Sequence, residues 1–236
     1  MQSTRGFSIS ITCSTLTLLV LGSAPAFSEE QGAVEISPDA AVVQFVSRDY
    51  IHGVPYEGAR ALGTAAVPAL RRYLDVEALK PRWSTVLTTI GMIGAPESYE
   101  ILHSFIWGGR FSGEVDSHTF RALMAAQGAM AYAAAADTNN VLSYLVDSSD
   151  PTFWGKVAWR SGPRSPERIA ELFADISTTG LALTGTARAR KRLERMRDTP
   201  PTPLLGKLAA KELTKHETVR RDGLGGYLRG RNHSEH

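Results

Sequence analysis

The sequence predicts an all-α fold, and within it a short right-handed α-solenoid of antiparallel helix pairs. Helix start signals, in which a small polar residue or an aspartate stands beside a proline, recur along the 236 residues. Apolar residues between these signals recur three and four positions apart, while alternating strand patterns do not appear. The helical runs also resemble one another, which favours stacked units over the alternative, an irregular helical bundle.

Each expected helix follows a start signal. Ser37-Pro38 precedes the first run, and Ser165-Pro166 opens the last long run before the basic region. The expected helical runs are 40–50, 83–92, 97–107, 117–136, 138–146, 166–183 and 204–215, with a further helix opened by Asp150-Pro151. The connections are only a few residues long, so we expect neighbouring helices to pack antiparallel.

Similar units follow one another along the middle of the chain. The pair Leu62-Gly63 ends one helix, and Ile93-Gly94 ends a later one in the same way. An apolar face follows each turn, as in residues 67–74 after the first glycine. A helix pair of this size cannot bury its apolar stripe alone, so neighbouring pairs have to cover it.

These stretches resemble HEAT-repeat proteins of the short bacterial type. Residues 61–74, 88–97 and 137–151 are similar to the inter-helix turn, the end of the first helix and the second helix of that family. The resemblance implies a repeat domain over 37–197 that presents a surface to a protein partner. The glycine-rich insertion at 108–113 departs from the pattern. HEAT-type repeats also occur in bilin lyases, so the resemblance leaves an enzyme as an alternative.

Residues 1–28 have the features of a signal peptide. Arg5 is followed by an apolar stretch at 9–21 and then by small residues, so cleavage after Ala26 or after Ser28 fits, and we prefer the second. The alternative is a membrane anchor, but a bilayer core needs about 20 apolar residues. We therefore expect a periplasmic or secreted protein that does not span a membrane after cleavage.

The mature chain that this cleavage would leave contains no cysteine. The only one, Cys13, lies within the signal segment, so we expect neither disulfides nor thiol chemistry. Residues 29–36 are polar and are expected to be a flexible linker. Prolines make a break at the start of 198–221, which continues as an amphipathic helix, and the glycine-rich residues 222–236 are expected to be a disordered basic tail.

Positive charge is concentrated at the end of the chain. The formal net charge is +2, yet from residue 186 onward 13 Lys and Arg stand against 6 Asp and Glu. The densest run, 188–197, is expected to be helical. Nucleic acid is not a plausible partner for an exported protein, whereas anionic lipid, a cell-wall polymer or an acidic protein patch could bind there. A solvated end of the repeat stack is the alternative.

Two acid–histidine pairs have spacings that could support chemistry. Glu100-x-x-His103 is the spacing used by di-iron bundles, but no second copy supplies the remaining ligands. Asp116 precedes His118 at an expected helix start, where a cap that stabilises by about 1 kcal/mol is the simpler role. An enzyme, the alternative function, would bring Glu100, His103 and His118 together in one buried cluster.

No catalytic motif occurs elsewhere in the sequence. We find no Gly-x-Ser-x-Gly, no His-Glu-x-x-His and no Walker-type loop. Gly91-x-x-Gly94 is surrounded by helical runs, with no strand before it, and is interpreted as a close helix contact. His233 and His236 lie at the chain end without fixed geometry. We therefore predict no catalytic residue, no cofactor and no metal site.

Two clusters of aromatic residues and arginine are candidate partner-binding sites. Trp107, Arg110 and Phe111 surround the glycine-rich insertion, and Trp159 and Arg160 lie in a later loop. Tryptophan and arginine are enriched at binding hot spots, although tryptophan is equally a core residue. The sequence thus predicts a protein-binding or scaffold module of the cell envelope.

Overall fold

The computed structural model describes residues 38–51 and 53–234. The expected signal peptide at 1–28 and the linker at 29–36 lie outside the described residues, as does His236. The described part is all-α, as predicted from the sequence.

The helices are α1 (Pro38–Val46), α2 (Tyr56–Ala61), η1 (Thr64–Ala66), α3 (Val67–Leu74), η2 (Glu77–Arg82), α4 (Trp83–Ile93), α5 (Ser98–Trp107), α6 (Ser117–Ala133), α7 (Thr138–Ser148), η3 (Pro151–Lys156), α8 (Pro166–Thr184), α9 (Ala187–Asp198) and α10 (Pro203–Ser234). Two short strands, β1 (Gly113–Glu114) and β2 (Trp159–Arg160), pair in parallel. The signal at Asp150-Pro151 therefore opens a 3-10 helix and not an α-helix.

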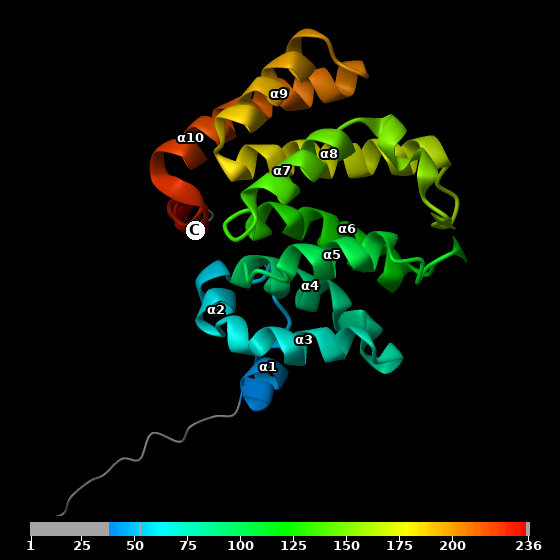
Figure 1. Ribbon diagram of the computed structural model, residues 1–236, viewed down its shortest axis with the longest axis vertical. Helices are drawn as coiled ribbons and strands as arrows, with labels where there is room; N and C mark the ends of the chain where they lie inside the picture. Colours follow the sequence, from blue (N-terminus) through cyan, green and yellow to red (C-terminus); the bar gives the residue numbers. More distant parts are fainter. Residues whose placement is uncertain (1–37, 52, 235–236) are drawn as a thin grey trace, which may run out of the picture. The chain divides into compact units, whose positions relative to one another are not determined.

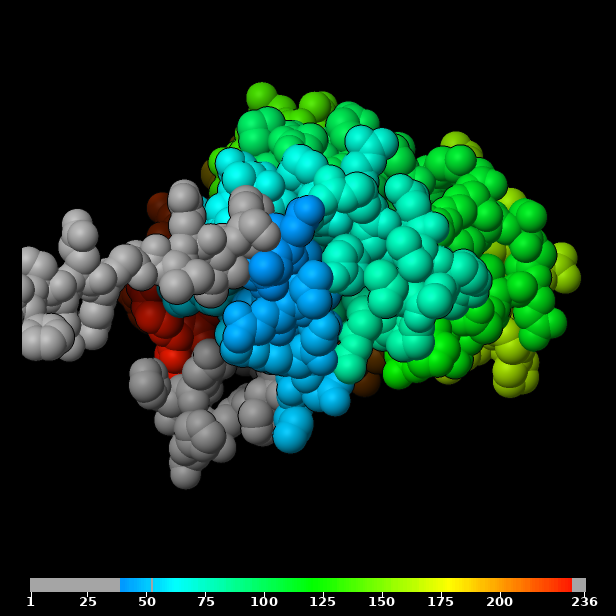
Figure 2. Space-filling view, turned by 90° about the horizontal axis from the view of Figure 1, so that it is seen from below, coloured from blue at the N-terminus to red at the C-terminus, as the bar shows by residue number. Residues whose placement is uncertain are grey.

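The helices pack in two rows (Figure 1). In the inner row, α4, α6, α8 and α10 each pack against the next. In the outer row, α5 contacts both α4 and α6, α7 contacts α6 and α8, and α9 contacts α8 and α10. Helix α3 packs on α4, and α1 packs on α3 and η1 at the end of the rows (Figure 2).

Glycines with a positive φ stand in three of the turns between helices. Gly94 and Gly185 end α4 and α8 in the left-handed conformation, each with a φ of 63°. Gly63 precedes η1 with a φ of 70° and an extended ψ of 171°. Both conformations are costly for residues with a side chain, so glycine occupies these turns most readily. The turn between α6 and α7 has no such glycine, and the carboxylate of Asp137 caps α7 by accepting a hydrogen bond from the Asn140 amide.

Small residues let the inner helices approach closely. A Cβ atom added to Gly91 on α4 would lie 2.5 Å from the carbonyl oxygen of Ala129 on α6. The two backbones are therefore in contact at this crossing. The interpretation of Gly91-x-x-Gly94 as a helix contact is confirmed.

The chain end differs from the expected disordered tail at 222–236. α10 is interrupted at Gly223, where φ is 71°, and is helical again up to Ser234. This last part packs against α2, where Arg229 forms an ion pair with Glu57 (side chains 62% and 58% exposed). Leu228 is half-buried there as well. Tertiary contacts of this kind order a glycine-rich segment whose composition alone predicts disorder.

Candidate binding groove

The inner row has one half-buried face. On α6 this face contains Ala125, Gly128 and Tyr132, and on α8 it contains Asp175 and Thr179. Residues three, four and seven apart share a face of a helix, so each helix contributes a single line of side chains. Most of these side chains are small, and the face is therefore hollow.

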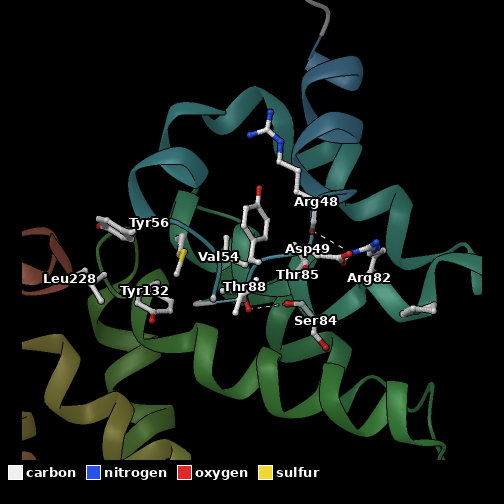
Figure 3. Close-up of a pocket in the computed structure, with 15 residues that line it drawn as sticks. Arg48, Asp49, Val54, Tyr56, Arg82, Ser84, Thr85, Thr88, Tyr132 and Leu228 are labelled. Carbon is white, nitrogen blue, oxygen red and sulfur yellow. Dashed lines mark hydrogen bonds and ion pairs between the residues drawn. The ribbon is translucent and has the colours of Figure 1, made fainter. Parts of the chain in front are cut away.

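Two cavities lie along this hollow. The first has a volume of about 540 Å³ and is bounded by the segment before α2, by α4, and by Tyr132 and Leu228 (Figure 3). The second has a volume of about 430 Å³ and lies between α4, α6, α8 and α10. Thr88 and Tyr132 line both cavities, so the two are neighbours. We call this pair of cavities the inner groove.

Hydroxyl groups and one ion pair characterise the first cavity. Arg82 forms an ion pair with Asp49 and donates a hydrogen bond to the carbonyl of Arg48 at 3.3 Å (Figure 3). The Thr88 hydroxyl donates to the carbonyl of Ser84 at 2.9 Å, which leaves its oxygen able to accept. The wall therefore offers acceptors to a ligand, while its one acid is already paired with an arginine.

A single acid stands in the second cavity. Among the described residues, Asp175 is the only charged one in its lining. The Oδ1 atom of Asp175 is buried and has no hydrogen-bond partner among the described residues. Burial raises the pKa of Asp175 from its ordinary value, Arg168 opposes this shift, and Glu171 adds to it. The cavity thus combines largely apolar walls with one carboxyl side chain.

The first sequence-predicted cluster is largely structural. The guanidinium of Arg110 lies 4.4 Å from the ring centroid of Trp83, and Phe111 packs against Phe105 at 5.2 Å. The indole N–H of Trp107 donates to the Tyr144 hydroxyl at 3.1 Å. These contacts tie the insertion at 108–113 to the helices, and none of the three predicted residues lines the inner groove.

The second sequence-predicted cluster is split by the structure. Trp159 is 3% exposed and packs against Phe120 and Phe173. Arg160 is exposed, and its carbonyl accepts a hydrogen bond from the Val115 amide at 2.9 Å. Trp159 is therefore a core residue, and only the Arg160 side chain is available to a partner.

The acid–histidine pairs do not form one site. The His103 ring packs against Tyr144 at 5.5 Å, and burial lowers the pKa of His103 while the nearby Glu100 opposes that shift. His118 lies instead beside Arg121, with Nδ1 at 3.0 Å from its guanidinium. No group of three or more His, Cys, Asp and Glu side chains in the described ranges could hold a metal ion.

The predicted cap at Asp116 is confirmed. Its carboxylate accepts hydrogen bonds from the amides of His118 and Thr119 at 2.8 and 2.9 Å. The Lys80 ammonium also donates to it at 2.9 Å. The Asp116–His118 spacing is therefore explained by the start of α6.

The arginines of α9 are mostly bonded to neighbouring helices. Arg188 and Arg192 donate to the hydroxyls of Ser143 and Ser149 at 3.1 and 2.9 Å. Arg190 forms ion pairs with Glu194 and Glu217, and Arg197 pairs with Asp198. Lys191 and Arg195 are exposed. One face of the basic run thus bonds to neighbouring residues, and the other face is exposed to solvent.

Sequence reasoning missed the inner groove. A weak signal exists, because small residues recur at 125, 128 and 129 on one face of α6. Asp175 is a single acid within the run 172–183, which is otherwise apolar or carries only hydroxyls. Neither pattern identifies a cavity until the helices are placed side by side.

Comparisons of the chain with protein-family models, with curated proteins and with solved structures found no match. Among the described residues, none of the helices combines the length and apolar character that a bilayer crossing requires.

Proposed function

We propose that this protein is a binding module whose inner groove takes an extended segment of a protein partner. The observation that carries this proposal is the sharing of Thr88 and Tyr132 by two adjacent cavities. A ligand in one cavity can extend into the other, which suits a chain better than a compact small molecule. Small residues along α6 allow a bound backbone to approach closely.

The scaffold we propose is a HEAT-like α-solenoid. The recurring glycine turns at Gly63, Gly94 and Gly185 and the two rows of helices support it. In such proteins each helix pair contacts only its neighbours, and the inner row forms an extended binding surface. The ion pair between Arg229 and Glu57 is an additional contact, because it joins the last helix to a helix near the start of the domain.

We propose that the module acts in the cell envelope or outside the cell. The signal-like segment at 1–28 supports this location. Intact-mass measurement of the protein recovered from the envelope tests it, since cleavage after Ala26 or Ser28 gives two distinct masses. A full-length protein in the cytoplasm would refute export.

Site-specific photo-crosslinking tests the groove. A photoreactive amino acid is placed at Thr88 or Thr179, which line the groove, and in matched variants at Arg72 or Ser104, which are exposed outside it. In the native envelope, the groove positions should give a discrete crosslinked partner and the outer positions should not. The same products from all four positions would reject the groove as the binding surface.

A second proposal concerns the basic end of the chain. Lys191, Arg195, Lys207 and Lys211 are exposed on α9 and α10, which supports weak binding to an anionic surface. Sedimentation with vesicles that contain about a third anionic lipid tests it, because each juxtamembrane cation contributes about 1 kcal/mol. Equal binding by a variant with all four changed to Gln would rule it out.

A further inference from the structure

The second cavity of the inner groove contains an acid without a partner. Asp175 projects from α8 beside Thr179, and its Oδ1 atom is buried without a hydrogen bond in the part of the chain that is described. A buried carboxylate oxygen without a donor costs free energy in the unbound protein. Oδ1 itself is closed off from the cavity, so a ligand there can contact the carboxylate only through Oδ2, and the negative charge of Asp175 favours a cationic ligand.

No basic side chain in the described ranges forms an ion pair with Asp175. Arg168, on the same helix, acts on Asp175 through its charge but is bonded to Glu171 at 3.0 Å. The cavity residues on α4, α6 and α10 carry no charge. A ligand that complements the charge of Asp175 would therefore be a cation.

The walls determine which cation fits. Ile176, Leu183 and Leu208 are apolar, and Ala125 and Gly128 leave space between them. A lysine or arginine side chain has an apolar stem and a charged head, and it matches a cavity of about 430 Å³ with an acid on its wall. A bare metal ion would find one carboxylate and no further anionic ligand.

We infer that this cavity is the specificity pocket of the inner groove and takes a lysine or arginine side chain of the partner, whose head donates to Asp175. The inference rests on the proposed function of the groove. The partner segment is therefore expected to carry a lysine or arginine at some distance along its chain from the residues that contact Thr88 and Tyr132.

Nuclear magnetic resonance with small probes tests the pocket without the partner. The probes are N-acetyl-arginine N-methylamide and N-acetyl-lysine N-methylamide, and their neutral counterparts are built on citrulline and on N-acetylated lysine. We expect both basic probes to shift the amide signals of Ala125, Thr179 and Leu208. We also expect them to lower the pKa of the Asp175 carboxyl. The neutral probes should bind at least about tenfold more weakly, because a charged hydrogen bond is lost.

Three variants make the test specific. Asp175→Asn should reduce binding of the basic probes by about tenfold or more. Gly128→Leu should abolish binding by filling the cavity, and it tests the pocket even if Asp175→Asn fails to fold. An added Cβ at Gly128 meets only Ile176 Cγ2 at 3.8 Å. Glu100→Gln removes an exposed acid outside the groove and should leave probe binding unchanged.

Equal binding of charged and neutral probes, or the absence of shifts in the cavity with either, would overturn the assignment. Photo-crosslinking separates this outcome from failure of the groove itself. If Thr88 and Thr179 crosslink one partner equally well in the wild type and in Asp175→Asn, the groove function stands and the basic specificity is wrong.

Discussion

Glu212 and His216 lie one turn apart on α10, and both are buried in the stripe that packs against α8 and α9. Their exposures are 2% and 0%. The stripe also contains Leu205, Ala209 and Val219, all apolar. His216 Nε2 lies 2.9 Å from the carbonyl of Thr186, and since a carbonyl can only accept, this nitrogen donates. His216 Nδ1 has no hydrogen-bond partner in the described part.

Replacing these buried polar residues together with apolar ones should stabilise the protein. Buried ionisable groups exchanged together for well-packed apolar ones are often neutral or gain about 1–4 kcal/mol. The Thr186 carbonyl keeps a donor in the Arg190 amide, but Lys215 forms an ion pair with Glu212 at 2.6 Å and its side chain is only 20% exposed, so it has to be replaced with its partner. We expect Glu212→Leu/Lys215→Met/His216→Leu to raise the free energy of unfolding in urea by about 1–2 kcal/mol.

The control for this variant is Glu212→Ala, which removes the side chain without filling its space. We expect it to be destabilising, because a cavity remains and His216 stays buried. If the triple variant unfolded at a lower urea concentration than the wild type, the buried polar residues would be shown to stabilise the α9–α10 packing.

Tyr144 connects four helices through hydrogen bonds. Its hydroxyl donates to Gln127 Oε1 at 2.6 Å and accepts from the Trp107 indole, while Gln127 Nε2 donates to Ser177 at 2.8 Å. Burial raises the pKa of Tyr144 well above its ordinary value, although the hydrogen bond from Trp107 opposes the shift. The hydroxyl therefore stays neutral and can both donate and accept.

Removing the Tyr144 hydroxyl leaves two partners unsatisfied. We expect Tyr144→Phe to lower the free energy of unfolding by about 1–3 kcal/mol. The matched variant is Tyr99→Phe, since the Tyr99 ring packs at 6.3 Å from Tyr144 and its hydroxyl makes no hydrogen bond within the described residues. It should change stability by less than about 0.5 kcal/mol. Equal losses in the two variants would show that the network adds nothing to stability.

The contact between α4 and α6 makes Gly91 intolerant of even a methyl group. A Cβ there would overlap the Ala129 carbonyl, so the helices have to separate. We expect Gly91→Ala to cost about 1–3 kcal/mol in thermal or urea unfolding. Gly128→Ala is the control, because its Cβ has room and alanine favours the helix by about 0.5–1 kcal/mol. A Gly91→Ala protein as stable as the wild type would contradict the close crossing.

Local signals allowed much of the fold to be predicted from the sequence. Asp116, Ser165 and the turn glycines act through bonds or dihedral angles within a few residues, so composition and spacing identify them. The expected first helix ended too late, at residue 50, and the structure ends α1 at Val46. Boundaries of this kind depend on tertiary packing.

Features set by contacts between helices could not be predicted. The last helix is amphipathic, as the sequence predicts, but its leucines Leu208 and Leu213 are only half-buried, and Glu212 and His216 share the buried stripe. The position of α8 and α9 decides which face is covered. Asp175 is a similar case, because an acid in a helix carries no local sign of the cavity it will line.

The cap of α6 gives a pH-dependent prediction. The hydrogen bond from the Thr119 amide, followed by that from Lys80, lowers the pKa of Asp116 from 3.8 to about 2. A group with a lowered folded-state pKa stabilises the protein above its unfolded pKa, and this stabilisation is lost as the pH falls through the folded value. The contribution of Asp116 should therefore be complete above pH of about 4 and should disappear towards pH of about 2.

We expect Asp116→Ala to lower the free energy of unfolding by about 1 kcal/mol at neutral pH, the usual value for an N-cap. The Asp116 side chain is half exposed, so its ion pair with Lys80 adds little to that figure. The difference between wild type and variant should shrink when urea unfolding is repeated between pH 4 and 2, because the carboxylate that accepts the amide hydrogen bonds becomes protonated. If the difference in unfolding free energy between wild type and variant stayed constant down to pH 2, the Asp116 cap would not depend on the charge of its carboxylate. Glu100→Gln, which neutralises an exposed acid that accepts no capping hydrogen bond, is the control for the loss of one negative charge.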